Sequence, residues 1–111
     1  RADLGDTVRR LTAYAEAGAD CLYAPGVRDI EAVRTIVTEL APKPINVLVH
    51  GDFFTVKQLA DVGVRRISVG GALARTAYTA FNNAACEMLE HGTFTSLAKA
   101  IPRVDFDMLF T

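Results

Sequence analysis

Apolar residues recur along this chain in patterns that alternate between helical and strand-like spacing. A helical pattern follows Asp6, and another follows Asp29 and stops before Pro42. Short, almost wholly apolar runs lie between the helical segments, as is typical of strands covered by helices. The pattern predicts helices at about 6–17, 30–40, 55–63 and 72–91, and strands at 19–24, 45–49 and 64–69.

Local signals set the limits of these elements. Asp6 and Asp29 are predicted helix caps, and Thr55 with Gln58 has the spacing of a capping box. Gly18 stands where a helix ends in a left-handed residue. The helix boundaries are therefore predicted independently of the apolar pattern.

Helices and strands alternate, and this order requires parallel strands joined by right-handed helical crossovers. Residues 15–26 also resemble residues 60–71, because both read helix end, glycine, strand, glycine. Such a repeat indicates consecutive strand–helix units of one array. Three strands cannot close an eight-stranded barrel, which typically needs about 250 residues. The chain is either a small open sheet or part of a barrel, and the large apolar residues after Pro102 favour a part.

Composition excludes several classes of protein. The chain has 111 residues, of which 50% are hydrophobic, with 12 basic and 13 acidic residues and a net charge of −1. These values argue against a disordered chain and against a nucleic-acid partner. No apolar run reaches the roughly 18 residues of a membrane span, so we expect a soluble, cytoplasmic protein. Cys21 and Cys86 form no Cys-x-x-Cys motif and are predicted to be buried thiols.

Three segments in order resemble the isocitrate lyase/phosphoenolpyruvate mutase superfamily: Gly18–Gly26, Pro44–Leu48 and Leu59–Arg75. The resemblance covers about residues 8–100 and is strongest to a less characterised branch. It implies an α/β fold, the C-terminal portion of a (β/α)₈ TIM-type barrel, with these strands as the sixth to the eighth. Residues 1–111 would then be a C-terminal fragment of a single barrel domain, with residues 93–111 as a C-terminal extension.

The resemblance also implies a function. It indicates a Mg²⁺-dependent lyase or mutase that cleaves or forms C–C or P–C bonds next to an α-oxo carboxylate of a small oxo-acid substrate. An enolate intermediate needs a hard cation and fixed donors in a dry pocket. In this superfamily the magnesium carboxylates and the catalytic gating loop lie in the first half of the barrel. The chain alone is therefore expected to lack the metal site and to be inactive.

The helix predicted at 72–89 has a wide apolar face. This face either covers the end of the barrel or packs on another subunit. The resemblance favours the second, because superfamily members exchange the last barrel helix between subunits. We therefore expect a homo-oligomer, a dimer or a tetramer.

The carboxyl ends of the strands carry the chemistry in such barrels. This places Tyr23, Pro25, Asn46, His50 and Ser68 at the positions of interest. The asparagine is polar within an apolar strand, so it needs partners. It matches the asparagine of the superfamily's Asn-x-Leu stretch, where that residue can bind substrate, and the alternative is a structural hydrogen bond. The histidine is either an acid, base or anion donor, or a solvated loop residue.

Two departures from the superfamily leave the substrate open. Pro25 stands where many of its lyases have a glutamate, which argues against a standard isocitrate or methylisocitrate lyase. The stretch Val49-His50-Gly51 replaces a more usual acidic or glycine-rich one, and we include His50 and Gly51 among the candidate substrate-binding residues.

Two other functions remain open from the sequence. One is a non-catalytic α/β module that binds a phosphorylated ligand or a protein partner, and the other is a barrel of a different phosphate-using family. Gly70-Gly71, which opens a predicted helix, could expose amides to a phosphate, or it could form only a tight turn.

Overall fold

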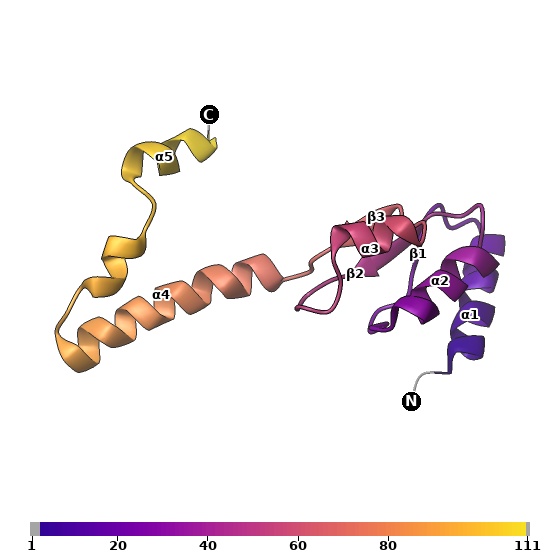
Figure 1. Ribbon diagram of the computed structural model, residues 1–111, viewed down its shortest axis with the longest axis horizontal. Helices are drawn as coiled ribbons and strands as arrows, with labels where there is room; N and C mark the ends of the chain where they lie inside the picture. Colours follow the sequence, from indigo (N-terminus) through magenta and orange to yellow (C-terminus); the bar gives the residue numbers. More distant parts are fainter. Residues whose placement is uncertain (1–2, 111) are drawn as a thin grey trace. The chain divides into compact units, whose positions relative to one another are not determined.

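The structure is a computed structural model that describes residues 3–110, and its contacts divide the chain into two compact units, Arg1–Ala72 and Leu73–Thr111. Helices and strands alternate in the first unit, as the sequence predicts, and the long helix α4 follows (Figure 1). The elements are α1 (Leu4–Glu16), β1 (Leu22–Tyr23), α2 (Ile30–Glu39), β2 (Ile45–Leu48), α3 (Val56–Asp61), β3 (Arg66–Ser68) and α4 (Ala72–His91).

The three strands form one parallel sheet in the order β1-β2-β3. Tyr23 is in register with Asn46, and Leu48 is in register with Ser68. The central strand is the longest, and the edge strands are shorter than the predicted 19–24 and 64–69. An edge strand has a ladder partner on one side only, so fewer of its residues form a regular ladder.

Most of the predicted helix boundaries are confirmed, and one is wrong. The Asp29 carboxylate accepts the Ala32 amide at 2.9 Å, and the capping box of Thr55 and Gln58 is complete. However, α1 begins earlier than predicted, with Asp3 rather than Asp6 as its cap. Asp3 has the extended backbone that a capping residue needs and accepts the Gly5 amide at 3.0 Å.

Asp6 instead lies inside the first turn of α1. Its carboxylate contacts Arg9 and Arg10, each at 2.6 Å. The hydrogen bonds from Arg9 and then Arg10 lower the pKa of the Asp6 carboxyl group below its ordinary value. This exposed acid is therefore a first-turn ion-pair partner, which also interacts favourably with the helix dipole.

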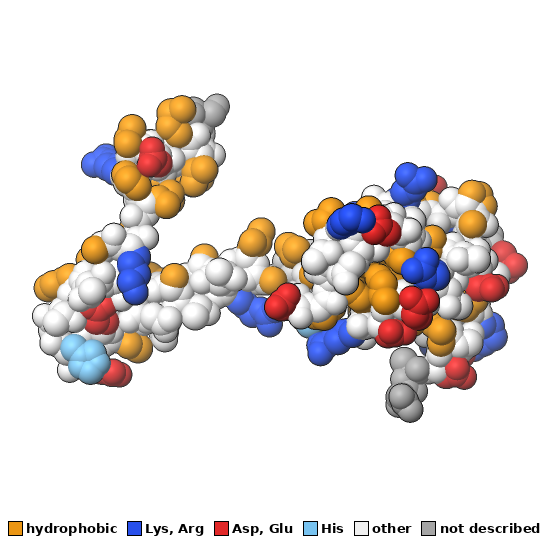
Figure 2. Space-filling model, viewed as in Figure 1, with side chains coloured by type: hydrophobic (Ala, Val, Ile, Leu, Met, Phe, Trp, Pro, Cys, Tyr) orange, Lys and Arg blue, Asp and Glu red, His pale blue; other side chains and the backbone are white. Residues whose placement is uncertain are grey.

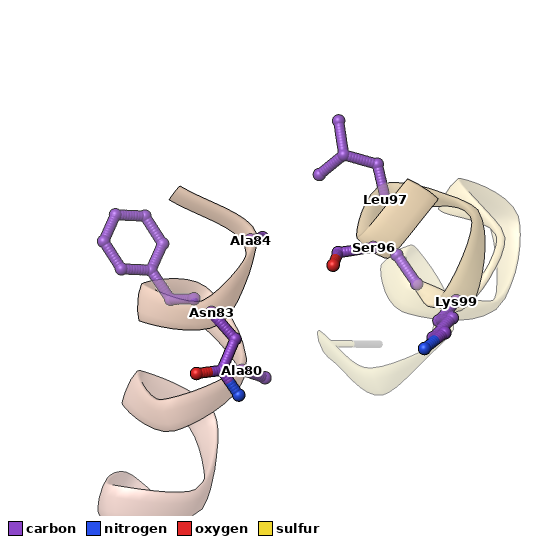
Figure 3. A pocket seen from close by; sticks show the side chains of 8 residues that line it. Ala80, Asn83, Ala84, Ser96, Leu97 and Lys99 are labelled. Carbon is purple, nitrogen blue, oxygen red and sulfur yellow. The ribbon is translucent and has the colours of Figure 1, made fainter. Parts of the chain in front are cut away.

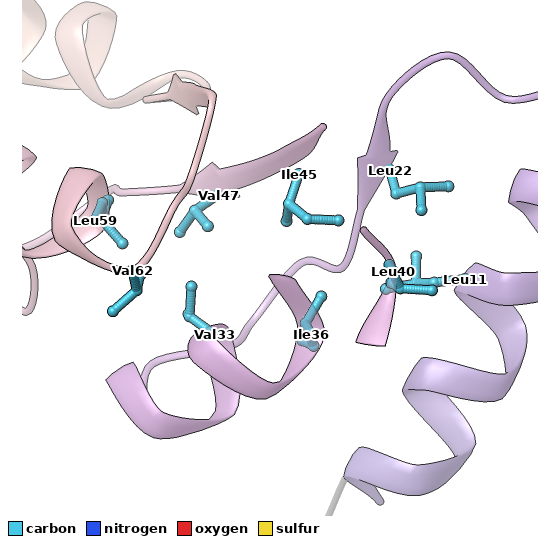
Figure 4. Close-up of a cluster of buried hydrophobic side chains, with 9 residues drawn as sticks. All are labelled: Leu11, Leu22, Val33, Ile36, Leu40, Ile45, Val47, Leu59 and Val62. Carbon is cyan, nitrogen blue, oxygen red and sulfur yellow. The ribbon is translucent and has the colours of Figure 1, made fainter. Parts of the chain in front are cut away.

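The hydrophobic core of the first unit lies between one face of the sheet and its helices (Figure 4). Leu11 of α1, Ile36 of α2 and Leu59 of α3 meet the strand residues there. Side chains alternate along a strand, so Ile45 and Val47 project into this core and the residue between them projects from the other face. The buried apolar residues are Leu11, Leu22, Val33, Ile36, Leu40, Ile45, Val47, Leu59 and Val62.

The prediction that both cysteines are buried is wrong. Cys21 is exposed and Cys86 is half-buried. Cys21 immediately precedes Leu22, whose side chain is in the core, and alternation turns the thiol away from that core. A small apolar residue is often buried, but the face it occupies depends on its neighbours.

The second unit contains most of α4, the 3₁₀ turn η1 (Thr95–Lys99), the short helix α5 (Arg103–Asp107) and the 3₁₀ turn η2 (Met108–Phe110). Many of its large apolar side chains lie at the surface, as the orange atoms of Figure 2 show. On α4, Tyr78 is 73% exposed and Leu89 is 86% exposed. None of the described helices, between residues 3 and 110, has the length and apolar character needed to cross a bilayer.

Glu87 connects α4 to the segment that follows it. Its carboxylate accepts the Thr93 hydroxyl at 2.6 Å, the Thr95 amide at 2.6 Å and the Ser96 amide at 2.8 Å. Hydrogen bonds from Ser96 and Thr93, followed by the backbone amides, lower the Glu87 pKa to about 2. This contact holds η1 beside α4, where an open groove of about 450 Å³ separates Ala84 from Leu97 (Figure 3).

The link made by Glu87 should depend on pH. Because the folded-state pKa lies below the ordinary value of 4.5, the stabilisation is complete above that pH and is lost as the pH falls towards 2. We expect the protection factors of the Thr95 and Ser96 amides, which compare their exchange with the intrinsic rate at each pH, to fall over this range. Glu87→Gln should weaken protection at neutral pH and remove the dependence, whereas the control Glu90→Gln should leave both unchanged. Equal protection in both variants would contradict this role.

Candidate functional site

Asn46 occupies the middle of the central strand and projects from the face opposite the core. It is only 4% exposed. Its Nδ2 donates a hydrogen bond to Ser68 Oγ at 3.0 Å, and its Oδ1 is buried with no partner among the described residues. Exchanging the amide oxygen and nitrogen would still leave one polar atom unpaired.

An unpaired buried amide atom is unfavourable, by about 1–3 kcal/mol in protein mutational data. Natural proteins rarely retain such a group without a ligand, water or mechanistic role. Asn46 therefore presents a fixed polar group that can bind a ligand on this face. Its hydrogen bond to Ser68 explains how the side chain is oriented, so the structural and ligand-binding interpretations of the sequence are compatible.

Tyr23 and Ser68 lie on the neighbouring strands. Tyr23 is in register with Asn46 and is 43% exposed, so its side chain is open to ligand or to further protein. Ser68 is half-buried and accepts the amide hydrogen bond from Asn46. The structure thus brings together three of the sequence-predicted positions on one face of the sheet.

Pro25 follows β1 and forms a turn with Gly26. It lines an open groove of about 540 Å³ together with Thr7 and Arg28. This groove is at the edge of the sheet where the strands end, because it is built from the start of α1 and the loop after β1. Pro25 therefore lines a groove at this edge of the sheet, and Asn46 and Ser68 do not line the same groove.

His50 and Gly51 lie in the loop after β2. The His50 ring is half-buried, and its centroid lies 5.4 Å from that of Phe53 in an edge-on arrangement. Gly51 accepts the Phe53 amide at 3.1 Å, which makes the loop turn tightly. Among the described residues, His50 has only this ring contact, so the structure does not pair it with Asn46.

Sequence reasoning missed one residue in this region. The Arg28 guanidinium carbon lies 5.4 Å from the centre of the Phe53 ring, which joins the loops after β1 and β2. Phe53 also packs against Phe54, with ring centroids 5.2 Å apart. A charged residue between the Pro25-Gly26 turn and the Asp29 cap was the available signal, but its partner follows only from the fold.

Gly70-Gly71 forms the turn between β3 and α4. Gly70 has a positive φ of 54°, and the Ala72 amide donates to the Val69 carbonyl at 3.1 Å. A side chain at Gly70 would contact Leu48 at 3.4 Å. These features account for the glycines as a tight turn, and phosphate binding by the pair stays a prediction.

The described residues do not fit a magnesium site. Between residues 3 and 110, no group of three or more His, Cys, Asp or Glu side chains is placed to hold a metal ion. The polar groups around Asn46 are an amide, a serine hydroxyl and a tyrosine. Magnesium prefers carboxylate oxygens and water in octahedral geometry, so any such ion would need ligands from elsewhere.

Comparison with known proteins decides the family. The sequence profile of the phosphoenolpyruvate phosphomutase family matches residues 1–89. The chain belongs to this family. The predicted resemblance to the isocitrate lyase/phosphoenolpyruvate mutase superfamily is thus confirmed. No curated protein sequence matches the chain.

Solved structures agree with this assignment. A candidate lyase/mutase from Burkholderia cenocepacia J2315 is 46% identical, with a TM-score of 0.90 over 99% of this chain and 40% of its own. A candidate phosphonomutase from the same organism is 33% identical, with a TM-score of 0.69 over 81% of this chain and 34% of its own. Oxaloacetate acetylhydrolase bound to oxalate is 26% identical, with a TM-score of 0.71 over 88% and 34%, respectively.

The chain therefore spans 40% or less of the length of these three relatives. They are TIM barrels, so the predicted fold class is confirmed and the three-stranded sheet corresponds to part of a barrel. Such barrels bind their ligands at the carboxyl ends of the strands. The loops that carry Pro25, Arg28, His50 and Phe53 are at that end.

Proposed function

We propose that this chain is the C-terminal part of a barrel enzyme that forms or cleaves a C–C or P–C bond next to an α-oxo carboxylate. Its strands would be the sixth to the eighth, and residues 93–111 would be a C-terminal extension. The observation that carries the proposal is the buried, incompletely paired amide of Asn46. The chain belongs to a family of mutases, and its structural relatives include a lyase/mutase and an acetylhydrolase. These relationships support the reaction class.

In this proposal, Asn46 binds a substrate oxygen or hydroxyl, and Ser68 holds its amide in place. Tyr23 and Pro25 line the substrate side of the sheet, and the His50-Gly51 loop closes one wall. A fixed donor costs no reorganisation when charge develops on a substrate oxygen, which is why pre-oriented amides favour enolate-like states. These residues orient the substrate, and the chain alone is expected to be inactive.

We propose that the complete enzyme uses Mg²⁺, which would supply charge stabilisation for an enolate oxygen. Its ligands would come from the remainder of the barrel. The substrate we expect is a small oxo acid.

We further propose a homo-oligomer in which helix α4 is exchanged between subunits, so that its apolar face packs on the partner. Leu73, Tyr78, Phe81 and Leu89 are each more than 70% exposed. Monomeric soluble proteins rarely leave a large contiguous apolar surface in water. A partner subunit that covers this face would remove that cost.

An assay of the complete protein tests the function. Oxaloacetate and phosphoenolpyruvate are incubated with the protein, with Mg²⁺ or with a chelator, and products are followed by ¹³C and ³¹P NMR. We expect turnover of at least one oxo-acid or phosphonate-forming substrate, which the chelator abolishes and added Mg²⁺ restores. Residues 1–111 alone should give no turnover. Turnover by that chain alone, or none by the complete protein on any oxo acid, would contradict the proposal.

A further inference from the structure

Two consecutive arginines at the amino end of β3 belong to opposite faces of the sheet. Arg66 is the first residue of β3 and is in register with Asn46 on β2. The hydrogen bond from Asn46 to Ser68 shows that Ser68 projects from the same face as Asn46. Side chains alternate along a strand, so Arg66, two residues before Ser68, also projects from this face, and Arg65 projects from the other.

The Asn46 face carries a positive charge that no described residue neutralises. By register and alternation, its strand residues are Tyr23, Asn46, Leu48, Arg66 and Ser68. Between residues 3 and 110, Arg66 forms no ion pair. No acid therefore lies among the strand residues of this face.

The other charged and titratable groups near Arg66 do not pair with it either. Those in the segments that lead into the three strands, and at the ends of α2 and α3, are Asp20, Cys21, Glu39, Lys43, Asp61 and Arg65. Asp61 pairs with Lys57 at 2.7 Å, and the Lys43 ammonium donates to the Ala19 carbonyl at 2.8 Å. In the part of the chain that the structure describes, Arg66 thus has no electrostatic partner.

The barrel fold determines what covers this face. The helices pack against the opposite face of the sheet, through the core that contains Ile45 and Val47. In a TIM barrel the helices form the outer layer, so the Asn46 face is the interior one, which side chains from all the strands fill. An arginine enclosed there without an opposite charge would be strongly unfavourable.

We propose that Arg66 forms an ion pair with a carboxylate side chain from the part of the barrel that closes over the Asn46 face. The planar guanidinium donates two parallel hydrogen bonds to such a group, which makes the contact directional. A shift of β3 by one residue would move Arg66 to the outer face, so the pair would also favour one register between the two parts of the barrel. This inference rests on the barrel fold in the proposed function and not on the reaction.

The test uses urea unfolding of the complete protein, followed by circular dichroism at pH 7.5. Arg66→Met keeps an unbranched apolar stem but leaves the carboxylate unpaired in the interior. We expect the unfolding equilibrium constant to rise roughly 100- to 1,000-fold, because removal of one partner of a buried ion pair is strongly destabilising. The matched control Arg65→Met, at the adjacent exposed position, should change this constant less than about threefold.

The pH dependence distinguishes an ion pair from lost packing. In Arg66→Met, burial raises the pKa of the unpaired carboxyl group above its ordinary value. A raised folded-state pKa means that protonation favours the folded protein, so the loss of stability relative to the parent is complete at pH 7.5 and shrinks as the pH falls towards 5. Arg66→Lys keeps the charge and should retain most of the stability at both pH values.

Each other outcome contradicts the ion pair. A loss in Arg66→Met no larger than that in Arg65→Met would show an arginine that stays in solvent, and an equal loss at both pH values would show a packing role. If Arg66→Met does not fold at pH 7.5, recovery of the folded spectrum at pH 5 supports the pair, and failure to recover overturns it. Because no substrate is involved, a negative result in the oxo-acid assay would leave this inference standing.

Discussion

Replacing Leu59 by alanine should lower the free energy of unfolding by about 3 kcal/mol, within the 2–5 kcal/mol range of buried Leu→Ala changes. Leu59 is 1% exposed and contributes the α3 side of the core. Its truncation removes apolar contacts and leaves a cavity that the rest of the core can fill only in part. The measurement is urea unfolding of the variant and the parent protein, followed by circular dichroism.

Val56→Ala is the matched control because it lies on the same helix and is 73% exposed. It should change stability by no more than about 0.5 kcal/mol. Similar shifts of the unfolding midpoint in the two variants would show that α3 does not pack as described.

Replacing Asn46 should separate activity from stability. Under the proposed function, Asn46→Leu should lower kcat/KM about 100-fold, because a substrate oxygen would lose its hydrogen-bond partner in a dry site. A 100-fold loss corresponds to about 2.7 kcal/mol of transition-state stabilisation. The same change replaces an incompletely paired amide by an apolar group of similar shape. The free energy of unfolding should therefore stay within about 1 kcal/mol of the parent value or rise.

A purely structural asparagine would behave in the opposite way. Its replacement would cost about 1–3 kcal/mol of stability through the lost hydrogen bond to Ser68, with activity per folded molecule retained. Asn83→Leu, at an exposed position on α4, is the control for a change from amide to apolar side chain. Kinetics and chemical unfolding on the same samples distinguish the two cases.

The sequence predicted best those features that depend on neighbouring residues. The Asp29 cap and the Thr55–Gln58 capping box are hydrogen-bond arrangements between residues close in sequence. The short, almost wholly apolar run of β2 is typical of a buried central strand. The cap of α1 is Asp3 rather than the predicted Asp6, and the extended backbone that distinguishes Asp3 as the cap cannot be read from the residue types. The exposure of Cys21 could not be predicted because it depends on which face of β1 packs on the helices.

The candidate site was predictable only where a signal lies within one short segment of the sequence. A lone polar residue in an apolar strand drew attention to Asn46, but its pairing with Ser68 depends on strand order and register. Arg28 and Phe53 are far apart in sequence, and neither residue type indicates that the two side chains meet. Contacts between loops need the whole sheet to be assembled before they exist, so no short motif encodes them.

Both edge strands of the sheet have a free side, since β1 and β3 each pair only with β2 among residues 3–110. Backbone donors and acceptors on such edges are templates for further strands. This segment therefore has the features needed for fragment complementation, in which two separately produced parts of a barrel reassemble through matching edges. If it is mixed with the remaining part of the barrel, the yield of assembled barrel should depend on the concentrations of both parts.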